Sequence, residues 1–281
     1  MVEIPDQRGR VFIVTGANVG IGRATAEALA ARGAEVWLAC RSEAKAIPVI
    51  DAIRASGGTA DFLRLDLADL ASVRDAARSF LAKGRPLHVL VNNAGLAATP
   101  GLTKDGFELT FGTNHLGHFL FTELLLARLR ASAPARIVNV ASGSHFRAKG
   151  VSFDRLRTSL RGTGRYEYSV SKLCNVLFTK ELANGRAGKG ITSYAVHPGT
   201  VASDIWRRIP GLVRPLVTMF MKSNEEGAAT TLYCACSPDV ADEDGLYYAS
   251  CRPSTPSRVA RDPALARELW QRSDEWTRAF H

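Results

Sequence analysis

A tyrosine and a lysine stand four residues apart at the start of a long apolar segment of helical period. They open and close the run Tyr168-Ser169-Val170-Ser171-Lys172, and this spacing places the phenol and the ammonium on one face of a helix. A phenol with its ordinary pKa of about 10 is a poor proton donor or acceptor at neutral pH, and a neighbouring ammonium would lower that pKa. The pair therefore suits acid-base catalysis, although amphipathic helices also place such pairs by chance.

Two further polar residues could complete such a site. Ser142 follows a short apolar run, and its hydroxyl could bind a reacting oxygen. Ser144 competes for that role, and either hydroxyl could instead cap a turn. Asn114 lies inside an otherwise helical apolar segment, where Asn has low propensity. Its side chain or a freed carbonyl could hold a water that contacts Lys172, or the side chain could be satisfied within the core.

A glycine-rich turn comes directly after the first apolar run of the chain. That run leads into Thr15-Gly16-Ala17-Asn18-Val19-Gly20-Ile21-Gly22. The three glycines lack the Cβ atoms that would keep a phosphate away, and the N-terminus of the following helix attracts negative charge. The turn predicts that a dinucleotide pyrophosphate binds along Gly16, Asn18, Gly20, Ile21 and Gly22, with an ordinary tight turn as the alternative.

The end of the second apolar run indicates which dinucleotide would bind. Many dinucleotide folds place an acidic residue there against the ribose 2′-hydroxyl, whereas this chain has Arg41. A guanidinium can pair with a 2′-phosphate that a carboxylate would repel, so NADP(H) is favoured over NAD(H). The alternative is a solvated arginine after a strand.

Short polar motifs also follow the third and fourth apolar runs. Asp66-Leu67 could contact the adenine, and Asn93-Ala94-Gly95 could let the backbone approach the cofactor closely. Taken singly, the first could be a helix cap and the second a turn. Their order along the chain favours the cofactor interpretation.

Apolar runs rich in β-branched residues alternate with segments of helical period. Strands are predicted over 11–15, 35–40, 61–65, 87–92, 136–140 and 192–197, with 245–249 as a seventh. Helices are predicted over 22–32, 45–56, 70–83, 110–131, 166–184 and 225–237. This alternation is typical of βαβ units. It predicts an α/β fold with a Rossmann-type doubly wound parallel sheet of about seven strands and helices on both faces, as a single domain over residues 1–281.

Composition narrows the classes of partner. With 281 residues, 46% of them hydrophobic, the chain can bury a sizeable core. The net charge of +9 suits anionic partners, but the arginines are scattered and form no nucleic-acid-binding motif, so no nucleic-acid partner is expected.

The five cysteines fit no zinc or disulfide framework, and no metal site is expected. Cys40 and Cys174 lie in apolar runs, as small buried hydrophobes do. Because the N-terminus is polar and no apolar run reaches transmembrane length, a cytoplasmic protein is expected.

In this order, the motifs resemble those of the short-chain dehydrogenase/reductase superfamily over nearly the whole chain. The resemblance is closest to the retinol dehydrogenase group, and it rests on the segments Leu38–Arg41, Asp105–Glu108, Asn114–Phe119, Ser171–Thr179 and Val196–Val201.

The resemblance implies a catalytic tetrad of Asn114, Ser142, Tyr168 and Lys172. In reduction, Tyr168 would protonate the carbonyl oxygen as hydride arrives, and Ser142 would polarise that oxygen. Lys172, together with the positive nicotinamide ring of the oxidised cofactor, would lower the pKa of the tyrosine, and it would also bind the nicotinamide ribose. Asn114 would support a proton-relay water.

The resemblance further implies that Pro198, Gly199, Val201 and Ser203 line the nicotinamide and that residues 201–223 form a substrate lid. This lid segment is apolar with interleaved arginines, which predicts a hydrophobic small-molecule substrate, retinal-like, aliphatic, aromatic or polycyclic. The same stripe could instead face a second subunit or a membrane surface. Segments 110–131 and 166–184 form the dimer surface in many relatives, so a homodimer or homotetramer is expected.

Three departures and several alternatives accompany the resemblance. Ala141 stands where a second serine is frequent, Ser203 replaces a more usual threonine, and the membrane-anchoring N-terminal segment of many retinol dehydrogenases is absent from this sequence. The alternatives to an oxidoreductase are a non-catalytic NADP(H)-binding sensor, an interaction module that uses the basic surface, and a light-dependent reductase of the protochlorophyllide type. A sensor would need the glycine turn but not Ser142, Tyr168 and Lys172.

Overall fold

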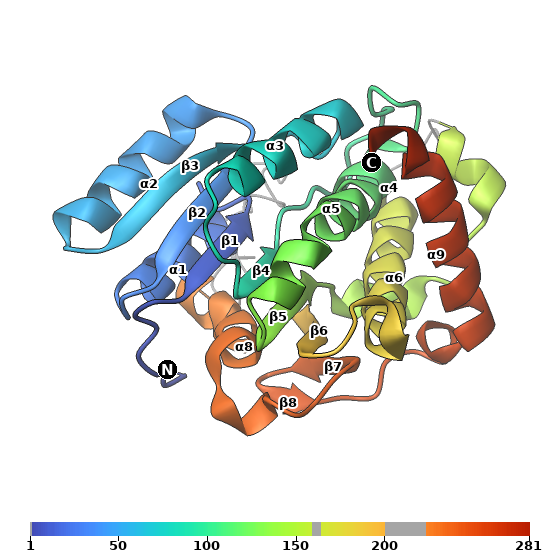
Figure 1. The fold of residues 1–281 in the computed structure, drawn as a ribbon. Coiled ribbons are helices and arrows are strands. Elements are labelled where there is room, and N and C mark those ends of the chain that lie inside the picture. The colour runs from blue at the N-terminus through green and yellow to red at the C-terminus, as the bar shows by residue number, and fades with distance from the viewer. Residues whose placement is uncertain (1, 159–163, 200–222) are drawn as a thin grey trace, which may run out of the picture.

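The computed structural model describes residues 2–158, 164–199 and 223–281, and within them one sheet of eight strands crosses the molecule (Figure 1). The strands are β1 (Val11–Thr15), β2 (Glu35–Cys40), β3 (Thr59–Arg64), β4 (Val89–Asn92), β5 (Ala135–Val140), β6 (Ile191–His197), β7 (Leu246–Ala249) and β8 (Arg252–Pro253). Their order is β3-β2-β1-β4-β5-β6-β7-β8, and each neighbouring pair is parallel except β7 and β8. The doubly wound parallel sheet is confirmed; the eighth strand is too short to give a sequence pattern.

Helices cover both faces of this sheet. The α-helices are α1 (Gly20–Ala30), α2 (Glu43–Ala55), α3 (Leu70–Ala82), α4 (Leu109–Phe111), α5 (Gly117–Ala131), α6 (Arg165–Glu181), α8 (Asn224–Cys236) and α9 (Pro263–Thr277). Single π-turns are η1 (Gly112–Leu116) and η4 (Leu182–Arg186), and short 3₁₀ helices are η2 (Gly143–Arg147), η3 (Phe153–Arg157), η6 (Pro238–Val240), η7 (Val259–Arg261) and η8 (Arg278–Phe280). Among the described residues, no helix has the length and apolar composition needed to cross a membrane.

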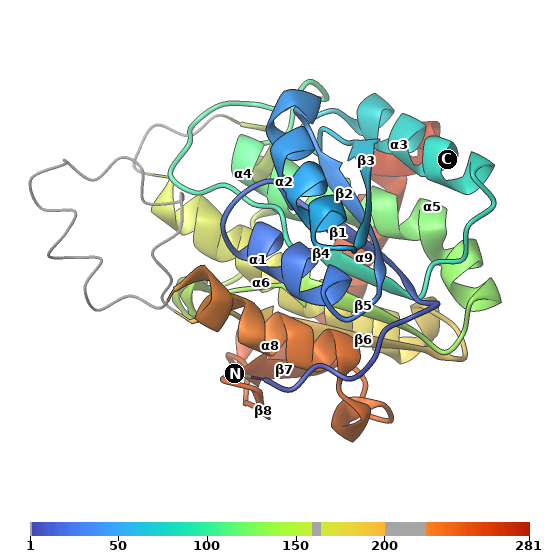
Figure 2. The same cartoon turned by 90° about the vertical axis from the view of Figure 1, so that its left-hand side faces the viewer.

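The central strands are apolar throughout because both of their faces are covered. In β1, Val11 and Ile13 pack into the core under α3, α5 and α6, whereas Phe12 and Val14 pack into the core under α1, α2 and α8. Successive side chains of a strand point to opposite faces, so two separate cores need an unbroken apolar run. Figure 2 shows these helix layers from the side.

The order of the strands determines where a ligand can bind. β1 lies between β2 and β4, so the chain connections leave β1 and β4 toward opposite sides of the sheet. Parallel α/β sheets bind ligands at the carboxyl edge beside this switch point. The glycine turn follows β1 and the Asn93 segment follows β4, so both predicted motifs meet at that edge.

Helix α9 was not predicted from the sequence. It begins with Asp262, whose side chain accepts hydrogen bonds from the amides of Ala264 and Leu265, and Pro263 occupies its first turn. These start signals were present in the sequence. Trp270 of α9 is buried 5.0 Å from the ring of Phe119 and 5.6 Å from that of Phe178. The helix therefore lies on α6 and α5, the predicted subunit surface, and Figure 1 shows it on the outside of α6.

We expect Trp270→Ala to lower the free energy of unfolding by about 3–5 kcal/mol, because it removes a large side chain from a closed aromatic cluster. Urea denaturation measures the change. Arg267→Ala on the exposed side of the same helix is the control and should change stability by less than about 0.5 kcal/mol. Equal effects of the two substitutions would show that α9 is not held through this cluster.

Candidate active site

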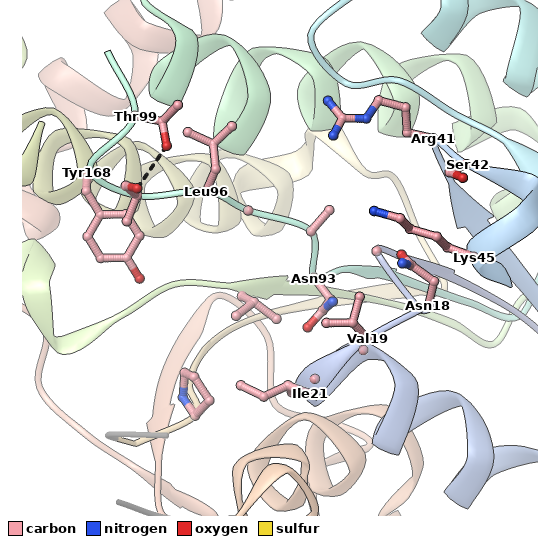
Figure 3. Close-up of a pocket in the computed structure, with 18 of the residues that line it drawn as sticks. Asn18, Val19, Ile21, Arg41, Ser42, Lys45, Asn93, Leu96, Thr99 and Tyr168 are labelled. Carbon is pink, nitrogen blue, oxygen red and sulfur yellow. Dashed lines mark hydrogen bonds between the residues drawn. The ribbon is translucent and has the colours of Figure 1, made fainter. Parts of the chain in front are cut away.

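A cavity of about 870 Å³ opens at the carboxyl edge of the sheet (Figure 3). Predicted site residues that line it are Gly16, Asn18, Gly20, Ile21, Gly22, Arg41, Asn93, Ala94, Gly95, Tyr168, Lys172 and Pro198. Arg41 stands toward one end of the cavity and Tyr168 toward the other, with Asn18, Ile21 and Asn93 between them. One continuous space therefore joins the predicted cofactor motifs to the predicted acid-base pair.

Other predicted residues lie behind this lining or elsewhere. Asn114, Ser142 and Gly199 do not line the cavity, and Val201, Ser203 and nearly all of the predicted lid lie outside the described residues. The Asp66 carboxylate accepts a hydrogen bond from the Ala68 amide at 3.1 Å, and Leu67 is buried.

The third-strand motif, Asp66 and Leu67, is thus not part of the cavity lining. Gly117 of α5 passes so close that an added Cβ would lie 2.5 Å from the Leu67 carbonyl oxygen. The helix cap considered for Asp66 is made instead by Asp69, which accepts from the amides of Ala71 and Ser72.

The glycines of the first turn are required by close approach of the backbone. Gly16 has φ +67°, and an added Cβ would lie 3.0 Å from Ala94. A Cβ on Gly22 would lie 2.5 Å from the Gly16 carbonyl oxygen. Helix α1 begins with no side-chain cap and no acidic residue in its first turn, so its first amides are left for an anion.

One hydroxyl joins the glycine turn to the segment after β4. Thr15 Oγ1 accepts hydrogen bonds from the amides of Asn93 and Ala94, each at 2.9 Å, and lies 2.8 Å from His118 Nε2. The other ring nitrogen, Nδ1, lies 3.0 Å from the Asn114 carbonyl oxygen, which can only accept. His118 therefore carries its proton on Nδ1, and Thr15 donates to Nε2. Burial lowers the pKa of His118 to about 4, consistent with this neutral ring.

Asn114 sits in the π-turn η1, where its side chain bonds to a neighbouring loop. Its Nδ2 donates to the Leu96 carbonyl at 2.9 Å and to Ser171 Oγ at 3.0 Å, and its Oδ1 accepts from the Leu96 amide at 2.9 Å. The Asn114 side chain is thus satisfied by hydrogen bonds within the protein, which was one of the two alternatives left open by the sequence. An added Cβ on Gly95 would lie 3.3 Å from Asn114 Oδ1 and 3.5 Å from Lys172 Nζ, so Asn114 adjoins the lysine without binding it.

The lysine and the tyrosine share the cavity wall as their spacing predicts. Lys172 Nζ donates to the Val140 carbonyl at 2.7 Å and lies 5.7 Å from the centroid of the Tyr168 ring. Burial lowers the pKa of Lys172 to about 7. Burial also raises the pKa of Tyr168, and a hydrogen bond with Ser142 opposes that rise. In the protein alone, the expected lowering of the tyrosine pKa by Lys172 is therefore not seen, and the phenol retains its proton.

Ser142, and not its competitor Ser144, is the serine whose hydroxyl lowers the pKa of the Tyr168 phenol. Its Oγ also accepts a hydrogen bond from the Ser144 amide at 3.1 Å, which caps η2. The capping role and the catalytic role, which the sequence left as alternatives, are compatible in one hydroxyl.

Sequence reasoning missed residues on both parts of the cavity wall. Ser42 and Lys45 stand beside Arg41 (Figure 3), and the signal was present because Lys45 lies one helical turn beyond Arg41 at the start of α2. Within the described ranges, neither Arg41 nor Lys45 forms an ion pair with an acidic side chain. Leu96 and Thr99 were also missed, and they lie toward the Tyr168 end of the cavity.

The two histidines beside Asn114 pack and form hydrogen bonds, as predicted. His115 and His118 are both buried, and the described part of the chain holds no group of three or more His, Cys, Asp or Glu side chains that could bind a metal ion. Cys40 and Cys174 are free and buried, as expected for small core residues.

Comparison with known proteins agrees with this geometry. The family model described as short chain dehydrogenase matches residues 10–211. Retinol dehydrogenase 12 from Mus musculus is 45% identical over 279 residues, which cover 98% of this chain and 87% of the relative. Retinol dehydrogenase 11 from the same organism is 45% identical over 274 residues, covering 96% and 85%.

Solved structures share the fold. An uncharacterised protein from Mycobacterium paratuberculosis superimposes with a TM-score of 0.79 at 34% identity, covering 98% of this chain and 96% of that one. A short chain dehydrogenase from Burkholderia cenocepacia, solved in complex with NADP, gives a TM-score of 0.70 at 27% identity, covering 86% and 96%. Family model, relatives and fold agree with the glycine turn and the Tyr168–Lys172 pair: the chain belongs to the short-chain dehydrogenase/reductase family and, within it, to the retinol dehydrogenase group.

Proposed function

We propose that the protein is an NADP(H)-dependent oxidoreductase that interconverts a hydrophobic carbonyl compound and its alcohol. The observation that carries the proposal is one cavity with Arg41 and Lys45 toward one end, the glycine turn in its middle and Tyr168 toward the other, where Lys172 lies beside the tyrosine ring. A nucleotide sensor would use the first two parts but would need no acid-base pair beside them.

The residues of the cavity fit the cofactor. The glycine turn leaves no room for Cβ atoms at Gly16 and Gly22, and the uncapped N-terminus of α1 offers amides to a pyrophosphate. By contrast, α3, α8 and α9 all have side-chain caps on their first amides. Helices α2 and α6 also begin without a side-chain cap, but they carry Glu43 and Glu167 in their first turns, which would repel an anion, whereas the first turn of α1 has no acidic residue.

The preference for NADP(H) rests on charge. Arg41 and Lys45 bring two cations, neither of them paired with an acid of the described residues, to the place where a 2′-phosphate would bind. The NADP complex of the related Burkholderia cenocepacia enzyme supports this choice. NADPH would supply hydride to the carbonyl carbon.

The chain's own residues would manage the proton and the oxygen. The buried Tyr168 phenol keeps its proton in the protein alone, so it can donate that proton to the carbonyl oxygen during reduction. Ser142, whose hydroxyl lowers the pKa of Tyr168, would hold the same oxygen. Lys172 would turn its ammonium from the Val140 carbonyl toward the ribose, and its charge would stabilise the phenolate left after proton transfer.

A hydrophobic substrate is supported by the cavity wall and by the relatives. Leu96, Ala97, Val140 and Ala141 line the cavity, and apolar walls select apolar substrates. The relatives at 45% identity are named retinol dehydrogenases. A retinal-like polyene or another extended apolar aldehyde is therefore the substrate class that we propose.

We further propose that the chain is a monomer, in place of the homodimer or homotetramer expected from the resemblance. The face of α6 that would meet a partner is covered by α9, through the buried cluster of Trp270, Phe119 and Phe178. The chain itself thus supplies the apolar cover that a second subunit would provide.

We expect Tyr168→Phe to lower kcat for NADPH-dependent retinal reduction by about 10²–10⁴-fold, because the proton donor is lost, while the Kd for NADPH stays unchanged. NADPH absorbance measures kcat, and fluorescence titration measures the Kd for NADPH.

Ser142→Ala should also lower kcat, and Ser144→Ala is its matched control with full turnover. Full turnover in Tyr168→Phe would refute the assigned chemistry, and NADPH binding without turnover by the native protein across apolar aldehydes and ketones would favour a sensor.

Arg41→Asp should raise KM for NADPH by roughly tenfold to a hundredfold, since a charge-assisted hydrogen bond contributes about 1.5–3 kcal/mol. KM for NADH should stay the same or fall, because the new carboxylate can accept from a 2′-hydroxyl. Lys45→Ala should shift the preference in the same direction. Arg78→Asp, an equal charge change on the exposed face of α3, is the control. An unchanged NADPH to NADH ratio in both cavity variants would contradict the phosphate assignment.

Light scattering on the purified protein should give a molar mass near that of one chain, 30.3 kDa. A stable dimer would contradict the monomer proposal. In that case, Trp270→Ala would show whether the dimer depends on the same cluster.

A further inference from the structure

The peptide group that follows Ser142 is held at both of its ends by imidazole rings. The Ser142 carbonyl oxygen lies 2.7 Å from Nδ1 of His145, and the Gly143 amide donates to Nδ1 of His197 at 3.2 Å. The carbonyl also accepts from the His145 amide at 3.1 Å. Since a peptide group is planar, a bond at each end fixes the orientation of the plane.

His145 connects this peptide to the C-terminal part of the chain. Its Nδ1 faces a carbonyl that can only accept, and its Nε2 accepts from the Ser257 amide at 3.1 Å. His145 is therefore neutral, with its proton on Nδ1. The ring is buried and packs on Tyr247 at a centroid distance of 4.9 Å, and the hydrogen bond from the Ser257 amide holds its far side independently of Ser142.

His197 holds the opposite tautomer. Its Nδ1 accepts from two backbone amides, those of Gly143 at 3.2 Å and Gly199 at 3.3 Å, so this nitrogen cannot carry a proton. An added Cβ on Gly143 would lie 3.2 Å from Nε2 of the same ring. His197 stands at the end of β6, where it joins the Ser142 turn to the Pro198-Gly199 segment.

The orientation of that peptide determines where the serine hydroxyl points. Ser142 has extended backbone angles, φ −165° and ψ 153°, and its N-terminal neighbour is fixed by a hydrogen bond between the Ala141 amide and the Val196 carbonyl. With the chain fixed on both sides, the direction of the Ser142 Cα–Cβ bond is set, and the hydrogen bond from the Ser144 amide to Ser142 Oγ at 3.1 Å then fixes the side-chain rotamer.

We propose that His145 and His197 are positioning residues for the Ser142 hydroxyl, acting on the two ends of the Ser142–Gly143 peptide. The proposal rests on the proposed function, because Ser142 would hold the reacting oxygen. An error of about 1 Å in the position of such a group can lower turnover about a hundredfold, so this fixed peptide bears directly on catalysis.

The first test needs no activity. Nitrogen-15 NMR of protein labelled in histidine reports the tautomer of each ring, and the His145→Asn and His197→Asn variants assign the two signals. We expect His145 protonated on Nδ1 and His197 protonated on Nε2, both neutral at pH 7. An Nε2–H tautomer for His145, or an Nδ1–H tautomer for His197, would overturn the proposal whether or not a substrate is known.

The second test separates the two bonds of His145 by kinetics. Asn carries its amide nitrogen near the position of Nδ1, so His145→Asn keeps a donor for the Ser142 carbonyl. Gln places its amide near Nε2, so His145→Gln keeps only the partner of Ser257. We expect His145→Gln to lower kcat by roughly tenfold to a hundredfold with unchanged Kd for NADPH, and His145→Asn to retain most of the native kcat.

Tyr247→Leu is the control for general loosening, since it removes ring packing on His145 but neither hydrogen bond. It should lower Tm and leave kcat per NADPH-binding site unchanged. Equal kcat in His145→Gln and His145→Asn, or a loss in Tyr247→Leu as large as that in His145→Gln, would refute the positioning role. If the native protein turns nothing over, the proposed function fails, and the tautomers alone decide this inference.

Discussion

Thr15 Oγ1 uses its whole hydrogen-bonding capacity at the carboxyl end of β1. It accepts two backbone amides from the segment after β4 and donates to His118, which in turn bonds to the Asn114 carbonyl. Three segments far apart in the sequence therefore meet at one hydroxyl. The glycine turn can approach Ala94 closely only while this junction holds, and both the floor of the cavity and the π-turn beside Lys172 depend on it.

Hydrogen bonds, most of them between uncharged groups, hold the side chains of the site in place. Lys172 is buried and donates to the Val140 carbonyl, and His118 and His145 each have both ring nitrogens hydrogen-bonded within the protein. A buried cation without a carboxylate loses stability through desolvation. This desolvation cost favours ligand binding, because an anionic or ribose partner would offset it for the Lys172 ammonium.

The sequence was sufficient for the parts of the site that depend on local spacing. Tyr168 and Lys172 lie on one helix, and Gly16, Gly20 and Gly22 lie in one turn, so a periodicity or a turn requirement identifies them. Asp66 and Leu67 were predicted from a carboxylate after the third strand and from the order of the motifs, and the close packing of Gly117 against Leu67 was not visible in that short motif.

Local spacing along the sequence could not predict contacts between distant segments. The bonding of Asn114 to Leu96 and Ser171 depends on how two loops meet on α6, which spacing does not determine. The same limit explains why the lysine was expected to lower the tyrosine pKa. Its distance from the ring is set by the Val140 carbonyl and not by the helix period.

The sequence analysis predicted no helix or strand over residues 250–281, yet this segment contributes to the site. The Ser257 amide bonds to His145, and its side chain accepts from the Ala260 amide in η7, just ahead of α9. α9 in turn covers α6, the helix that carries Tyr168 and Lys172. The C-terminal segment thus contacts the Ser142 turn at one end and the acid-base helix at the other, so the two halves of the catalytic group share one support outside the parallel sheet.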